Sequence, residues 1–173
     1  MTSFVLGGGC FWCLDSSFML FKGVADVEVG YMGGPGANPS YEAVCNGNTG
    51  HAEVARVHFD ESMISAETIL DIFFTIHDPR QLNRQGNDIG TQYRSAMFFE
   101  DDGQKALFYA AIERAKSVWG EGIVTEVVPA TEFWMGEEYH QDFFAKNPNQ
   151  GYCNAVVSPK MAKARAAFTE HLK

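Results

Sequence analysis

Along this chain the spacing of the apolar residues changes several times between the alternation typical of strands and the spacing typical of helices. This change of spacing limits the possible folds more than any other feature of the sequence. Residues 24–31 and 51–60 alternate in the manner of strands. Residues 11–21 carry apolar side chains at helical spacing, and Ser65 stands where it can cap a helix over residues 65–78. The elements alternate too irregularly for repeated β–α–β units. We therefore expect an α+β two-layer sandwich, with helices packed on a largely antiparallel or mixed sheet.

The remaining elements follow from the same patterns. Further strands are predicted at residues 4–6, 96–100 and 123–130, and further helices at 101–120, 137–148 and from about residue 158. The polar segment 80–95 contains glycine and is long for a connection, which is typical of a functional loop. At 173 residues, without a repeat or a linker, the chain is expected to form one domain over residues 1–173.

The charge balance excludes two classes of partner. Asp and Glu number 22 against 13 Lys and Arg, for a net charge of -9. Nucleic acids and anionic membranes require clustered Lys and Arg, which this sequence does not have. No apolar stretch is as long as a membrane span, and residues 1–9 lack the features of a signal peptide. The sequence predicts a cytoplasmic protein that binds neither nucleic acid nor membrane.

The segment GGGCFWC, residues 7–13, places three glycines before a cysteine and two aromatic residues after it. The glycines allow a sharp turn and the close approach of another molecule. Cys10 would then lie at a helix start, near unpaired N–H groups. The helix dipole lowers a thiol pKa of about 8.5 by less than about one unit, so further activation is needed. We favour a reactive Cys10 over a small buried residue at a turn.

Glu53 is the second candidate. In HAEVARVHF the two-residue period places Glu53 on the same, more apolar, face as Ala55, Val57 and Phe59. A carboxyl group on that face is desolvated, which raises its pKa from about 4.3. A rise of roughly two to three units would make Glu53 a useful proton donor at neutral pH. The alternative is a carboxylate in water at a strand edge, and the strand alone does not decide between them.

The other candidates are aromatic or polar residues. Phe11 and Trp12 flank Cys10 and point about 100° apart on a helix, so at least one of them could face an apolar ligand. Tyr41 and Tyr93 lie in polar segments expected to be loops, where a phenol can donate its O–H to a ligand. Asp88 could be a turn residue alone.

Two other functions compete with a reactive Cys10 acting alone. Cys10 and Cys13 form a CxxC pair, as in thioredoxin-like dithiol–disulfide oxidoreductases. Cys10, Cys13 and Cys45, with or without His51, could instead bind zinc in an interaction module. The uneven spacing of the four cysteines, with no second CxxC, makes the zinc site the weaker alternative.

Four segments in order resemble the A-type peptide methionine sulfoxide reductases: GGGCFWC, VCNGNTGHAEV, HDPRQLNRQGNDIGTQYRS and EEYHQDFFAKNPNQGYC. The resemblance runs from about Phe4 to Cys153. It implies an α+β two-layer sandwich with a ferredoxin-like plait. It also implies that the enzyme reduces the S epimer of methionine sulfoxide, free or in proteins, in the repair of oxidative damage.

The resemblance also implies a role for each matching residue. Cys10 matches the catalytic cysteine, and Glu53 matches the proton donor. Tyr41 and Tyr93 match the tyrosines that hydrogen-bond the sulfoxide oxygen. The other matches are the walls of the methyl pocket and a supporting polar residue, which are Phe11, Trp12 and Asp88.

Recycling is implied in the same way. Cys153 matches the recycling cysteine, in a C-terminal segment from about residue 146. It would condense with a sulfenic acid on Cys10, and thioredoxin or another external dithiol would reduce the disulfide. No second cysteine follows Cys153, so one internal disulfide suffices, and Cys13 is a spare thiol or an alternative partner. The resemblance implies a monomer with no metal and no organic cofactor.

Overall fold

The computed structural model describes residues 1–173 and contains one main sheet with the strand order β7-β6-β1-β3-β2-β8. Strands β6 and β7 run parallel, and every other neighbouring pair runs antiparallel. The sheet is therefore mixed, as predicted. Its strands are β1 (Thr2–Gly7), β2 (Val24–Met32), β3 (Ala52–Phe59), β6 (Ala96–Phe99), β7 (Glu126–Pro129) and β8 (Trp134–Met135).

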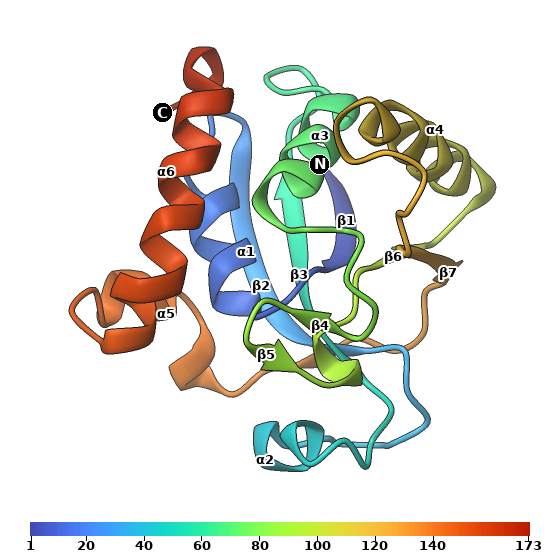
Figure 1. The fold of residues 1–173 in the computed structure, drawn as a ribbon, viewed down its shortest axis with the longest axis vertical. Helices are drawn as coiled ribbons and strands as arrows, with labels where there is room; N and C mark the ends of the chain where they lie inside the picture. Colours follow the sequence, from blue (N-terminus) through green and yellow to red (C-terminus); the bar gives the residue numbers. More distant parts are fainter.

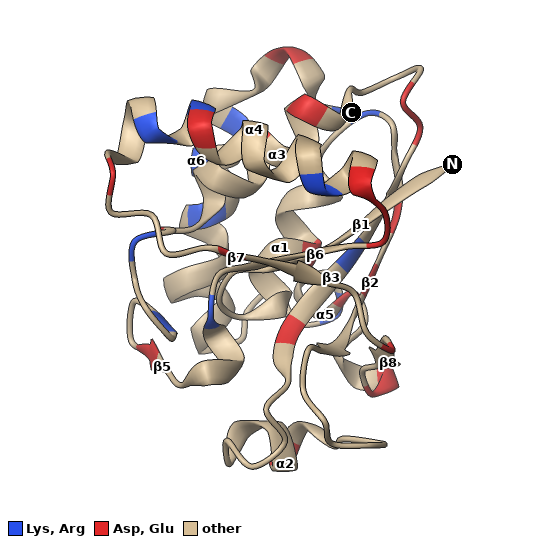
Figure 2. Ribbon diagram, turned by 90° about the vertical axis from the view of Figure 1, so that its right-hand side faces the viewer, with Lys and Arg blue, Asp and Glu red and all other residues tan.

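Four helices cover one face of this sheet, which gives the two layers visible in Figures 1 and 2. In chain order, β1, α1, β2, β3, α3 and β6 form a ferredoxin-like plait, with the antiparallel strand order β6-β1-β3-β2. This confirms the predicted α+β sandwich. The four helices are α1 (Phe11–Phe18), α3 (Ala66–Ile76), α4 (Asp102–Trp119) and α6 (Ser158–Ala167).

The start of α3 shows how the local sequence sets an element boundary. Ser65 is the N-cap of α3, and its hydroxyl accepts a hydrogen bond from the Thr68 N–H at 3.1 Å. This side-chain acceptor satisfies one of the N–H groups that the first helical turn leaves free. The prediction of a cap at Ser65 is confirmed.

The helix after Cys10 is shorter than predicted, because tertiary contacts end it. The helical spacing extends to residue 21, but α1 stops at Phe18. Phe21 forms an isolated bridge with Leu172, and the Lys22 N–H donates to the His171 carbonyl at 2.8 Å. These partners come from the far end of the chain, so the local apolar spacing could not indicate them.

Several short elements also differ from the prediction. The segment 80–95 is not an irregular loop, because it contains a hairpin and a 3₁₀ turn. Residues 137–148 form two short helical elements, and a π-helical turn precedes α6. Helix α2 and strand β8 were not predicted, and β7 is shorter than the predicted strand. The smaller elements are α2 (Tyr41–Cys45), β4 (Arg84–Gln85), β5 (Asp88–Ile89), the 3₁₀ turns Thr91–Tyr93 and Glu138–His140, α5 (Phe143–Lys146) and the π turn Cys153–Val157.

The main core lies between the sheet and the four helices. Phe4 of β1 is buried there, with its ring centroid 5.1 Å from that of Phe59 and 5.2 Å from that of Phe108. A smaller apolar cluster covers the opposite face of the sheet, where it packs against Val128, Ala130 and Phe133 instead of a helix. The buried members of this second cluster are Val5, Met32, Ala52, Val54, Ala96 and Phe98.

We expect Phe4→Ala to lower the free energy of unfolding by about 3–5 kcal/mol, because the change leaves a cavity between β1 and α4. Urea unfolding with linear extrapolation measures the difference. Tyr109→Ala is the matched control, since Tyr109 follows Phe108 on α4 and is 50% exposed. The control should change stability by less than about 1 kcal/mol. A loss below about 1 kcal/mol for Phe4→Ala would show that the core closes around the missing ring.

Figure 2 shows Lys and Arg scattered along the ribbon and interspersed with Asp and Glu. This distribution agrees with the charge argument against a nucleic-acid surface. None of the helices is both long and apolar enough to cross a membrane.

Candidate active site

Cys10 lies at the start of α1, just after a glycine in a conformation that other residues rarely adopt. Gly9 has φ +90°, and a Cβ added there would lie 2.8 Å from Cγ of Gln85. Glycine is therefore required at position 9 both by the backbone angle and by the close approach of Gln85. Cys10 occupies the N-cap position with extended backbone angles and is 8% exposed. The turn expected from the three glycines thus delivers the thiol to the helix start.

Glu53 reaches this helix start from β3. Its side chain is only 1% exposed, and its Oε1 accepts a hydrogen bond from the Phe11 N–H at 3.2 Å. Its Oε2 is buried and has no hydrogen-bond partner. Burial, followed by the charges of Asp88 and Cys13, raises the pKa of Glu53 to about 8, against the opposing effect of the Phe11 N–H. A neutral carboxyl group therefore lies beside the first turn of α1, with one oxygen free to donate a proton.

The two aromatic residues after Cys10 occupy different environments. Phe11 is fully buried, with its ring centroid 5.7 Å from that of Tyr31 and 6.3 Å from that of Tyr41. Trp12 is half-buried and stacks on Phe143 at a centroid distance of 3.8 Å and an interplanar angle of 4°. Together they form an aromatic wall beside Cys10.

Tyr41 and Tyr93 lie in helical elements and not in loops as predicted. The sequence suggested polar loops, but Tyr41 is the first residue of α2 and Tyr93 ends a 3₁₀ turn. Ser40 caps α2 by accepting from the Ala43 N–H at 3.1 Å. Burial, followed by the negative charge that Glu53 carries when it is ionised, raises the pKa of both tyrosine hydroxyls. Both therefore remain protonated hydrogen-bond donors close to Glu53.

Glu137 and His140 belong to the site, although neither was singled out from the sequence. Glu137 Oε1 accepts from the Tyr31 hydroxyl at 2.8 Å, and its Oε2 accepts from the Tyr41 N–H at 2.9 Å. His140 is buried, and its Nδ1 accepts from the Trp12 indole N–H at 3.0 Å. The segment EEYHQ contains both residues and was one of the four matching segments. Their partners lie about a hundred residues away, so spacing within the chain gave no signal.

Asp88 lies in β5 of the β4–β5 hairpin. Its Oδ2 accepts from the Tyr152 hydroxyl at 2.5 Å. A cavity of about 360 Å³ opens here and is lined by Gln85, Gly86, Asn87, Asp88, Tyr152, Val156 and Lys160. Asp88 is thus a polar contact between the hairpin and the segment that carries Cys153.

Cys10 and Cys13 form a coupled pair of thiols. Burial raises the pKa of Cys10 well above its usual range, and the hydrogen bond to Cys13 and the charge of Glu53 raise it further. That hydrogen bond lowers the pKa of Cys13, and the Lys160 ammonium also lowers it. The helix N-terminus therefore does not outweigh burial at Cys10, and the negative charge of the pair is favoured on Cys13.

Cys153 lies in the same apolar cluster as Cys10 and Cys13, and all three are buried. It is the first residue of the π turn before α6 and is 0% exposed. Burial, followed by the charge of Cys13, raises its pKa. The three thiols come together from two segments that are 140 residues apart in the sequence.

The fourth cysteine and His51 do not complete a metal site. Cys45 ends α2, where its carbonyl accepts from the Gln92 side chain at 3.4 Å. His51 Nδ1 accepts from the Gly34 N–H at 3.0 Å, and its Nε2 pairs with the Gly36 carbonyl. No three His, Cys, Asp or Glu side chains are arranged to hold a metal ion. The proposed zinc donors therefore do not fit a zinc site.

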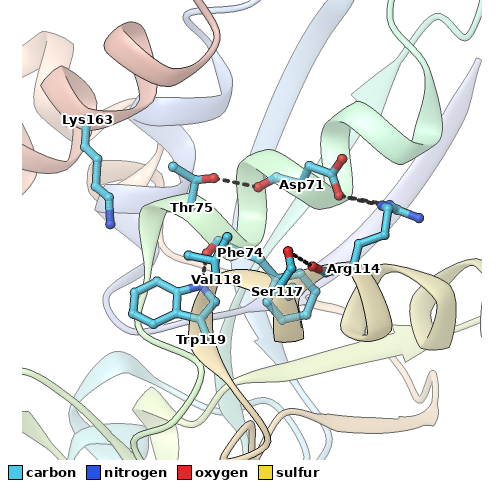
Figure 3. Close-up of a pocket in the computed structure, with 9 residues that line it drawn as sticks. Asp71, Phe74, Thr75, Arg114, Ser117, Val118, Trp119 and Lys163 are labelled. Carbon is cyan, nitrogen blue, oxygen red and sulfur yellow. Dashed lines mark hydrogen bonds and ion pairs between the residues drawn. The ribbon is translucent and has the colours of Figure 1, made fainter.

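A separate cavity of about 310 Å³ lies between α3, α4 and α6 (Figure 3). Two pairs of its lining residues are joined, since Arg114 forms an ion pair with Asp71 at 2.9 Å and the Trp119 indole donates to the Phe74 carbonyl at 2.8 Å. None of the candidate site residues lines it.

Comparison with known proteins gives consistent matches. The family model of peptide methionine sulfoxide reductase matches residues 2–172. A protein of Clavibacter michiganensis subsp. michiganensis named peptide methionine sulfoxide reductase MsrA is 57% identical over 173 residues, covering 100% of this chain and 99% of that protein.

Solved structures match as well. Reduced Mxr1 from Saccharomyces cerevisiae has a TM-score of 0.83 and 35% identity, and the match covers 88% of each chain. Mxr1 in complex with Trx2 has a TM-score of 0.59 and 23% identity, with 82% of this chain and 84% of that chain covered.

Proposed function

This chain belongs to the peptide methionine sulfoxide reductase family and is an oxidoreductase that acts on methionine sulfoxide, and we propose that Cys10 removes the oxygen with Glu53 as the acid. The observation that carries this assignment is the neutral, buried Glu53 carboxyl group beside the first turn of α1. The family match over residues 2–172 favours this function over the alternative, a CxxC dithiol–disulfide oxidoreductase.

The reaction begins when Cys10 loses its proton and its sulfur attacks the sulfur of the sulfoxide. Glu53 delivers a proton from Oε2, the oxygen without a partner, to the sulfoxide oxygen. The S–O bond of the substrate then breaks as the oxygen passes to Cys10. The products are methionine and a Cys10 sulfenic acid. The proton that left Cys10 replaces the one that left Glu53, so the step is balanced.

Tyr41 and Tyr93 stabilise the oxygen during this transfer. Both hydroxyls remain protonated near Glu53, so they can donate hydrogen bonds as negative charge develops on the oxygen. Phe11 and Trp12 provide an apolar wall suited to the S-methyl group of the substrate. Methionine lacks the oxygen, so it binds without these polar contacts and leaves.

Recycling passes through Cys153, in the C-terminal segment from about residue 146. Its thiol becomes part of the disulfide that replaces the Cys10 sulfenic acid. An external dithiol such as thioredoxin then reduces that disulfide by exchange. Mxr1, which shares this fold, forms a complex with Trx2, and this supports a protein dithiol as the reductant. Free and protein-bound methionine sulfoxide are both substrates, and no metal or organic cofactor takes part.

The test is methionine release from each separated sulfoxide epimer, measured without any reductant. The S epimer should yield at least about one methionine per chain, with a matching loss of free thiols and a modified Cys10. The R epimer should yield none. Release from neither epimer, or release while Cys10 stays unmodified, would refute the proposal.

A further inference from the structure

We propose that Cys13 is a third redox residue of this enzyme: it resolves the Cys10 sulfenic acid first and then passes the disulfide to Cys153. The inference rests on the proposed function of Cys10 and gives the recycling a defined order. It differs from direct condensation of Cys10 with Cys153, which the family resemblance implied. It is argued from the placement of three buried thiols in one cluster.

The first step depends on the geometry of the helix start. Cys10 is the N-cap residue of α1, and Cys13 lies one turn later. The Cys13 N–H donates to the Cys10 carbonyl at 3.1 Å, which holds the two residues in a closed turn. Both side chains are buried in the same apolar cluster. No rearrangement of the fold is needed to bring the Cys13 sulfur to a sulfenic acid on Cys10.

The second step depends on the packing of α1 against the π turn that begins at Cys153. Trp12 and Tyr152, the neighbours of the two cysteines, meet edge to face at a centroid distance of 5.7 Å. Cys13 and Cys153 are both buried in the cluster between these segments. The charge of Cys13 also raises the pKa of Cys153. Cys13 therefore shares one buried cluster with both other thiols.

The surroundings of Cys13 favour its thiolate. Lys160 of α6 lines the cavity beside Asp88 and Tyr152, and its ammonium acts on Cys13. The Tyr152 hydroxyl, which donates to Asp88 Oδ2, lines the same cavity as Lys160. A thiolate is the nucleophile in disulfide formation, so these contacts prepare Cys13 for attack on the sulfenic acid.

The chemistry balances without an additional oxidant. Cys13 attacks the sulfur of the Cys10 sulfenic acid, an S–S bond forms, and the oxygen leaves as water with two protons. Cys153 then attacks the Cys13 sulfur, the Cys10–Cys13 bond breaks, and Cys10 leaves as a thiolate. The proton lost by Cys153 compensates for the one gained by Cys10. The external dithiol finally reduces the Cys13–Cys153 disulfide and is itself oxidised to a disulfide.

The decisive experiment gives each variant one equivalent of the S epimer, without reductant, in the presence of dimedone, which labels sulfenic acids. Cys13→Ser should accumulate the label on Cys10, because its first resolving thiol is missing. Cys153→Ser should remain unlabelled and should contain a Cys10–Cys13 disulfide by peptide mapping. Direct condensation gives the reverse pattern. Label in Cys153→Ser, or none in Cys13→Ser, would overturn this relay, in which the disulfide passes from Cys10–Cys13 to Cys13–Cys153.

A second measurement counts methionine under excess substrate. The relay frees Cys10 for another reaction, so the wild-type chain should release about two methionines without reductant, and Cys153→Ser about one. Cys45→Ser is the matched cysteine-to-serine control and should show the wild-type disulfide pattern. Cys13→Ala and Cys153→Ala repeat both measurements in case a buried serine hydroxyl disturbs the packing.

The two proposals fail in different ways. If the wild-type chain releases methionine while Cys10 stays unmodified, the proposed function is wrong. If Cys10 is consumed and methionine appears, but the labelling pattern is reversed, the proposed function stands and only the relay is wrong.

Discussion

Cys10→Ser should release no methionine from the S epimer, even in a single turnover, and kcat/KM should fall by about four orders of magnitude or more. A serine hydroxyl is a far weaker nucleophile than a thiol at neutral pH, and no other thiol occupies the N-cap position of α1. Four orders of magnitude correspond to about 5.4 kcal/mol of transition-state stabilisation. Rapid-quench measurement of methionine release tests this directly.

The comparison with Cys153→Ser separates the loss of the nucleophile from a general effect on packing. Both variants replace one buried thiol of the same cluster by a hydroxyl, so a general effect on packing would impair both. We expect Cys153→Ser to keep the first methionine, because Cys153 acts only after oxygen transfer. Appreciable methionine release by folded Cys10→Ser would remove Cys10 from the reaction.

Glu53→Gln should lower kcat/KM by about 10²–10⁴-fold, the usual contribution of a general acid. Glutamine keeps the size of the side chain and can still accept the Phe11 N–H bond, but its amide cannot supply the proton. The pKa of Glu53 is raised to about 8, so wild-type Glu53 is protonated below that pH and loses its proton as the pH rises through it. The wild-type rate should therefore fall above about pH 8, and this decrease should be absent from Glu53→Gln.

A second buried carboxyl group provides the control. Asp15 of α1 accepts from the Asp142 N–H at 2.9 Å, and burial raises its pKa to about 7. Asp15→Asn removes this group, and the decrease above about pH 8 should remain. If Glu53→Gln is as fast as the wild-type chain across neutral pH, Glu53 is not the acid.

Local patterns predicted the parts of the fold that depend on nearby residues. The alternation in β3 placed Glu53 with Ala55, Val57 and Phe59, and this face is buried beneath the helices. Ser65 marked the start of α3 because a cap acts within one turn. The end of α1 could not be predicted, since it depends on the bridge between Phe21 and Leu172.

The candidate site also contains residues that the local sequence indicates and residues that only distant contacts bring into place. GGGC indicated the turn before Cys10, and the family resemblance gave Tyr41 and Tyr93 their role and added Cys153. Glu137 has no local feature that sets it apart from the other acidic residues, because its two hydrogen bonds reach β2 and α2. The burial of Cys13 in one cluster with Cys10 and Cys153 is equally a property of the packing of α1 against the π turn. Spacing could show the CxxC pair but not its distant neighbour.

Glu137 also has a kinetic consequence. It holds Tyr31 and Tyr41, and it lies on the same stretch of chain that leads to Cys153. Because the recycling thiols are buried, a protein reductant can reach them only if this stretch moves outward, and a movement that extended to Glu137 would break its hydrogen bonds to Tyr31 and Tyr41. Oxidised substrate and reductant should thus occupy the enzyme in alternation, which would appear as parallel lines in double-reciprocal plots of a ping-pong mechanism.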